Sequence, residues 1–93
     1  MIRSFRDRET EKVWNGARSR RLPADIQDVA LRKLRQLNRS VTLDDLRVPP
    51  GNSLEALTKD RKGQHSIRIN RQWRICFRWT EGGCEDVEIC DYH

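Results

Sequence analysis

The spacing of apolar residues changes halfway along the chain, and this change limits the fold more than any other feature. Over residues 23–38 apolar residues recur every three or four positions, which predicts an amphipathic helix. Over residues 64–70 and again over 73–79, apolar and polar residues alternate, as they do in strands with one buried face. A helix followed by several such strands predicts an α+β fold.

Shorter elements are expected around these two patterns. Asn70-Arg71 suits a tight turn between the alternating runs, because Asn tolerates positive φ. The other expected elements are a first strand at residues 1–5, a helix at 7–15 capped by Asp7, a helical turn after Thr42, a short strand at 54–57 and a last strand around Val87 and Ile89. The predicted order is β-α-α-β-β-β-β, with two N-terminal helices packed on one face of a mainly antiparallel, twisted sheet.

Length and composition exclude several classes of protein. With 93 residues, 35% hydrophobic and 35% charged, the chain is expected to form a single domain over residues 1–93. No apolar run approaches the ~20 residues of a membrane span, and the charged N-terminus lacks the apolar stretch of a signal peptide. We therefore expect no membrane association.

The cysteines are Cys76, Cys84 and Cys90. An odd number does not make a closed disulfide framework, so the sequence favours buried structural thiols and a cytoplasmic location. Cys84, Cys90 and His93 offer ligands for a metal, but the chain has no CxxC pair and a metal site is disfavoured. We expect neither a metal nor a cofactor.

Basic residues are concentrated in one stretch of the chain, residues 59–79. Lys and Arg number 19 against 14 Asp and Glu, which gives a net charge of +5. Strand alternation within the basic stretch places Arg68, Arg74 and Arg78 on the sheet face opposite the helices, with Glu88. This face is either an anion-binding surface or an ordinary solvent-facing one, in which Arg74 pairs with Glu88 across neighbouring strands.

Aromatic and histidine residues in the alternating runs follow the apolar phase. Trp73 and Trp79 share that phase, so they are expected in the core with Trp14 rather than as platforms for base stacking. His65 shares the phase of Ile67, and we expect a histidine at the edge of the core.

Several motifs, in order along the chain, resemble one family. They are the opening MIRSF, the stretch LRVPPGN, the pattern LxxLxxDRxGxxSIRxNxQWRxCF and the closing DYH. Together they resemble the HigB branch of the RelE/ParE toxin superfamily over essentially the whole chain. The resemblance implies a RelE-like fold and a toxin of a type II toxin–antitoxin system. It also implies a metal-independent, ribosome-dependent mRNA endonuclease that inhibits translation and growth.

The same resemblance implies partners. They are a HigA-like helix-turn-helix antitoxin, the 70S ribosome with its mRNA, and operator DNA only through the antitoxin. Antitoxins of this kind tend to bind away from the active face, which makes residues 39–51 and the long helix the candidate contact region.

Matching the family motifs to this sequence gives a set of candidate site residues. Arg74, in QWR, matches the arginine that faces the scissile phosphate, and Asp91, Tyr92 and His93 match the terminal DYH that lines the site. Glu55 departs from the family, because several HigB toxins carry a histidine there. The expected RNA-binding residues are Lys59, Arg61, Lys62, Arg68 and Arg78.

These residue types suit attack of an RNA 2′-OH on its own 3′-phosphate. The planar fork of Arg74 suits neutralisation of charge on the phosphate oxygens. His93 suits a general acid or base, because imidazole titrates near neutral pH. Asp91 is suited to orient that imidazole or to act as a base, Tyr92 to stack on a base or lose its proton, and Glu55 to act as a weak base.

Two other functions stay open on the sequence. Glu55, together with Thr58 near the position of a family lysine, is compatible with a weakly active toxin that serves mainly as an antitoxin-binding co-repressor. The fold is also that of ParE-like inhibitors of DNA gyrase, although the retained DYH end argues against this.

Overall fold

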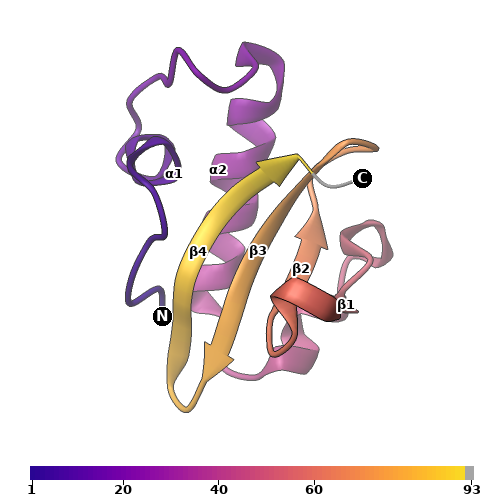
Figure 1. Ribbon diagram of the computed structural model, residues 1–93. Helices are drawn as coiled ribbons and strands as arrows, with labels where there is room; N and C mark the ends of the chain where they lie inside the picture. Colours follow the sequence, from indigo (N-terminus) through magenta and orange to yellow (C-terminus); the bar gives the residue numbers. More distant parts are fainter. Residues whose placement is uncertain (92–93) are drawn as a thin grey trace.

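The computed structural model describes residues 1–91 of the chain. Two helices come first, and the sheet follows after a stretch of short 3₁₀ turns (Figure 1). The helices are α1 (Arg8–Trp14) and α2 (Ala24–Arg39), and the strands are β1 (Glu55–Ala56), β2 (His65–Arg68), β3 (Trp73–Thr80) and β4 (Gly83–Asp91). The 3₁₀ turns are η1 (Leu43–Arg47), η2 (Pro50–Asn52) and η3 (Lys59–Arg61). The predicted α+β class is confirmed.

The strands lie in sequence order, β1-β2-β3-β4, and each pairs with the next in an antiparallel register. In Figure 1, α2 crosses behind the sheet and α1 lies beside the β4 edge. Val13 of α1 and Leu34 of α2 belong to one buried cluster, so both helices pack on the same core. The other sheet face is left without a helix, as the alternation of β2 and β3 predicts.

The N-terminal segment runs along the outer edge of β4. Isolated parallel bridges join Ile2 to Cys84 and Phe5 to Val87. The first strand predicted at residues 1–5 is therefore reduced to two bridges, because Asp7 already begins the turn into α1. The side chain of Asp7 accepts a hydrogen bond from the Thr10 amide at 2.7 Å, as expected for its cap.

The long helix agrees with its predicted range to within one residue at each end. Asp25 lies in the first turn of α2 and Arg39 in the last, where each charge opposes the helix dipole. After α2, the predicted helical turn is η1, and Thr42 and Asp45 form a capping box at its start.

The core lies between the helices and the covered face of the sheet. Phe77 and Leu34 are fully buried at its centre. Trp14, Trp73 and Trp79 are partly buried against this cluster, as expected. The buried members are Val13, Ile26, Ala30, Leu34, Leu37, Leu46, Ile67, Ile75, Phe77, Cys84, Val87 and Ile89.

His65 lies at the edge of this core, as the sequence indicates. Its ring stacks near Phe77 with 6.3 Å between ring centroids. Its Nδ1 atom is buried and has no hydrogen-bond partner among the described residues.

The turn between β2 and β3 differs from the prediction. The connection spans residues 69–72, and Asn70 is not among the described residues with positive φ. Instead, its side-chain oxygen accepts hydrogen bonds from the amides of Gln72 and Trp73, each at 2.8 Å. These two bonds to a local side-chain acceptor stabilise a loop longer than the predicted two-residue turn.

The expectation of three thiols is wrong for two of the cysteines. Cys76 on β3 and Cys90 on β4 form a disulfide, with 6.8 Å between their Cα atoms. They lie diagonally across the strand pair, because Cys76 is opposite Glu88 and Cys90 is opposite Arg74. Cys84 is a free, buried thiol, and burial raises its pKa to about 11.

None of the described helices is both long and apolar enough to cross a membrane.

Candidate functional site

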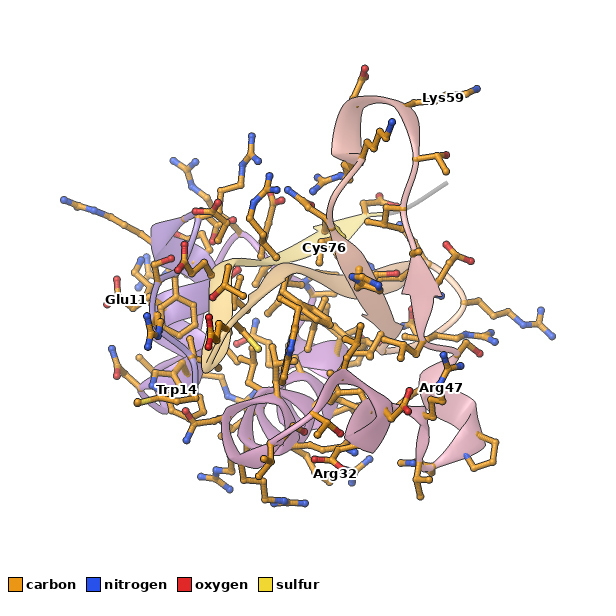
Figure 2. All side chains as sticks on the ribbon, turned by 90° about the horizontal axis from the view of Figure 1, so that it is seen from below. Glu11, Trp14, Arg32, Arg47, Lys59 and Cys76 are labelled. Carbon is orange, nitrogen blue, oxygen red and sulfur yellow. A yellow bond between two sulfur atoms is a disulfide. The ribbon has the colours of Figure 1, made fainter. Side chains whose placement is uncertain are left out.

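The helix-free face of the sheet carries the candidate site. Figure 2 shows Cys76 on the side of the sheet away from Arg32 of α2, with Lys59 at the tip of a loop on the same side as Cys76. The strand register places Glu55, Ser66, Cys76 and Glu88 in one row across this face. We call this surface the open face.

Arg74 lies in the next row of the open face, opposite Arg68 on one side and Cys90 on the other. Its Nε donates to the hydroxyl of Ser66 at 2.7 Å, and its Nη2 donates to the carbonyl of Ser53 at 2.6 Å. The half-buried side chain therefore lies across β2 toward the turn before β1.

Glu88, the alternative partner expected for Arg74, lies beside two other arginines. Arg61 Nη1 donates to the Glu88 carboxylate at 3.0 Å, and Arg6 Nε lies 4.0 Å from the same oxygen. Arg61 also donates to Gln64 at 3.1 Å. One carboxylate between two guanidinium groups leaves this part of the open face with a surplus of positive charge.

The remaining predicted arginines flank Arg74. Arg68 Nε donates to the Asn70 carbonyl at 3.0 Å. Arg78 is exposed and its Nε lies 3.9 Å from an oxygen of Asp86. Gly63 has a φ of +94°, and a Cβ there would lie 3.0 Å from Arg78 Nη1, so the glycine lets the η3 loop approach β3 closely.

The η3 loop holds the two predicted lysines above the sheet. Lys59 and Lys62 are both exposed, and Lys59 is at the outermost part of the loop in Figure 2. Leu57, just before the loop, is buried with the Cys76–Cys90 disulfide. This contact anchors the loop to the open face while its cations stay in solvent.

The predicted acidic residues occupy different positions. Glu55 is exposed on β1, directly opposite Ser66, which contacts Arg74. Asp91 is opposite Trp73 in the register, and its carboxylate accepts a hydrogen bond from Gln72 Nε2 at 2.9 Å. Asp91 is thus one residue beyond the row that contains Arg74 and Cys90, at the end of β4.

Tyr92 and His93, which we assigned from the family motif, lie outside the described residues. Over residues 1–91, no group of three or more His, Cys, Asp or Glu side chains is arranged to hold a metal ion.

The structure adds three residues to the site that were not predicted as part of it. Ser66 and Ser53 hold Arg74, and Arg6 extends the charged network around Glu88, which the alternation had placed on this face. The position of Ser66 in the alternating run predicts that it lies on the same sheet face as Arg68. The Ser53 contact uses a backbone carbonyl, which no side-chain pattern reveals.

Comparison with known proteins decides the family. A family model described as "RelE-like toxin of type II toxin-antitoxin system HigB" matches residues 3–93. The chain belongs to the HigB-like toxin family. The "Toxin HigB-1" of Vibrio cholerae serotype O1 is 39% identical over 83 residues, covering 88% of this chain and 87% of that protein.

A second relative extends the comparison. An "Uncharacterized protein" of Haemophilus influenzae is 33% identical over 86 residues, covering 91% of this chain and 85% of that protein. The predicted HigB resemblance is confirmed, and the helix-backed antiparallel sheet is consistent with the RelE-like fold of this toxin family.

Proposed function

We propose that this HigB-family toxin is a metal-independent endoribonuclease that cleaves mRNA on translating ribosomes. The observation that carries the proposal is the position of Arg74. Its guanidinium is held by Ser66 and Ser53 on the open face, among further cations and away from the apolar core. A planar cation with fixed orientation suits a phosphate whose negative charge grows during cleavage.

The chemistry is attack of a 2′-OH on the adjacent 3′-phosphate, which breaks the bond to the 5′-oxygen of the next nucleotide. The products are a 2′,3′-cyclic phosphate and a 5′-OH. Arg74 stabilises the charge on the phosphate oxygens. His93 acts as the general acid or base, supported by Asp91 and Tyr92, and Glu55 is a weaker acceptor of protons.

The surrounding cations bind the RNA backbone. The negative charges of Glu88 and Asp86 offset only part of the positive charge on the open face. Phosphate contacts of this kind position a nucleic acid without selecting its sequence, so the ribosome supplies the placement of the mRNA. The proposed RNA-binding residues are Lys59, Arg61, Lys62, Arg68 and Arg78.

The toxin–antitoxin family implies an antitoxin partner. We propose a HigA-like helix-turn-helix protein for this role, which brings the toxin to operator DNA. The ribosome and mRNA are the other partners, and the cytoplasm is the location where they meet the toxin.

The test is mapping of mRNA 5′ ends in cells after brief induction of the toxin. The wild-type protein is expected to arrest growth and to produce new 5′ ends within translated codons. Arg74→Ala is expected to reduce cleavage about 10²–10³-fold, as for removal of one transition-state donor. Arg32→Ala, which removes an exposed arginine from the opposite side of the molecule, is the matched control and should cleave like wild type.

The same experiment separates the alternatives. Equal cleavage by wild type and Arg74→Ala would contradict the role of Arg74. Growth arrest without new 5′ ends, accompanied by loss of DNA supercoiling activity in a gyrase assay, would favour a gyrase inhibitor. Binding to the antitoxin without growth arrest would favour a co-repressor.

A further inference from the structure

Ser66 is unusual among the residues of the open face because it is polar, small and completely buried. Its exposed fraction is 0%, although it lies on the sheet face that has no helix over it. Its hydroxyl accepts the Arg74 Nε hydrogen bond at 2.7 Å. The arginine side chain itself therefore helps to bury the serine, and the serine hydroxyl fixes the Nε end of the guanidinium.

A second contact fixes the outer part of the same guanidinium. Nη2 of Arg74 donates to the carbonyl of Ser53 at 2.6 Å, and lies 3.5 Å from the carbonyl of Ser66. Two bonds from different nitrogens of one rigid plane set both the position and the rotation of that plane. These contacts remove rotamer freedom from the arginine side chain before any RNA binds.

The Ser53 carbonyl is held by a well-anchored turn. Ser53 has a left-handed backbone, with φ 45° and ψ 55°, and follows η2 directly. The preceding Asn52 is fully buried, and its Nδ2 donates to the carbonyl of Leu46 at 3.0 Å and to Gln36 at 3.1 Å. Its Oδ1 accepts from the Lys33 ammonium. The turn is thus tied to α2, and the carbonyl has little freedom to follow the arginine.

From this geometry we infer that Ser66 is a positioning residue for the toxin's reaction, acting through Arg74. The inference rests on the proposed function for its kinetic consequence, but the contact itself is testable without any reaction. The hydroxyl selects one orientation of the guanidinium, and that orientation presents the fork to the scissile phosphate. A side chain whose orientation is fixed before the substrate binds raises the rate of the chemical step rather than the affinity for substrate.

The kinetic test uses Ser66→Ala with purified toxin and mRNA-programmed ribosomes. The single-turnover cleavage rate is expected to fall about 10–100-fold, the size of effect that a misplaced catalytic group produces. The Kd for the ribosome is expected to stay within about twofold, because the phosphate-binding cations are unchanged. Ser40→Ala is the matched control, since Ser40 is also a buried serine, 8% exposed, whose hydroxyl bonds to the Gln36 carbonyl away from the open face.

A double-mutant cycle tests whether Ser66 acts through Arg74. In an Arg74→Ala background, Ser66→Ala is expected to cause no further loss of rate. A further loss as large as in the wild-type background would overturn the inference, because Ser66 would then act by another route. An unchanged rate for Ser66→Ala alone would overturn it as well.

An NMR measurement separates this inference from the proposed function. In the wild-type toxin, the Arg74 Nε–H resonance, assigned through its absence in Arg74→Lys, is expected to be rigid and slow to exchange with water. In Ser66→Ala it is expected to become mobile. A mobile wild-type resonance would contradict the positioning role even if every serine variant failed to fold. A rigid resonance in a toxin that cleaves no mRNA would reject the nuclease proposal and leave the contact intact.

Discussion

The two faces of the sheet are built from the same strands but hold opposite kinds of side chain. On the covered face, Ile67, Ile75 and Phe77 pack on the helices and are fully buried. On the open face, the intervening residues include Ser66, Arg74 and a disulfide that links the two longest strands. Residues that pack the core and residues of the candidate site therefore alternate along the same strands. Substitutions at neighbouring positions should differ in how much they lower the free energy of unfolding.

Phe77→Ala is expected to give the largest effect, on the covered face. Removing a fully buried aromatic ring from the centre of the core should lower the free energy of unfolding by about 3–5 kcal/mol. Urea unfolding followed by circular dichroism measures it. Arg78→Ala, one residue further along β3 on the exposed side, should change stability by less than about 1 kcal/mol. Similar losses of unfolding free energy in the two variants would contradict the proposed difference between the two faces.

Alkaline pH should weaken the core through Cys84, which is fully buried and has its pKa raised to about 11. Above the ordinary pKa of a thiol, about 9, the unfolded chain loses this proton while the folded protein keeps it. The unfolded state is then favoured, so stability falls as pH rises from 9 toward 11. We expect this thiol to account for a loss of about 1–2 kcal/mol at pH 10.5. The measurement is unfolding by urea at pH 8 and pH 10.5, with Cys84→Ala as a control that should lack this component.

Glu88→Gln should have the smallest effect, and on the open face. Loss of the carboxylate beside Arg61 and Arg6 removes a partly exposed ion pair worth about 0–1 kcal/mol of stability. It also removes a negative charge from the proposed RNA-binding surface, so affinity for RNA should rise a few-fold at low salt and return to the wild-type value at high salt. Fluorescence anisotropy with a short RNA measures this change. Asp44→Asn, which breaks the exposed Arg47 pair on η1, should leave RNA affinity unchanged.

The elements of the fold were predictable because each carries a strong local signal. The stripe of α2 and the alternation of β2 and β3 indicate which side of each element is buried, and they predict opposite sides of the sheet for Arg74 and Phe77. The capping residues Asp7 and Thr42 are likewise local signals.

The details of the site were less predictable because they depend on contacts between distant segments. The Ser53 carbonyl reaches Arg74 from 21 positions away in the sequence, and a backbone acceptor has no residue-type signature. The disulfide joins residues 14 positions apart that become diagonal neighbours only once the register of β3 and β4 is known. The role of Asn70 was missed because its side chain, rather than its backbone, shapes the turn.

The N-terminal segment has a consequence for how the toxin behaves at high concentration. The Cys84 amide donates to the Met1 carbonyl at 2.9 Å and the Arg6 amide donates to the Val87 carbonyl at 2.9 Å, so the first residues occupy hydrogen-bonding groups along the outer side of β4. At the opposite margin the sheet ends in β1, a strand of two residues. A sheet shielded at one border and short at the other offers a poor template for adding strands from a second molecule, which protects a small protein from self-aggregation.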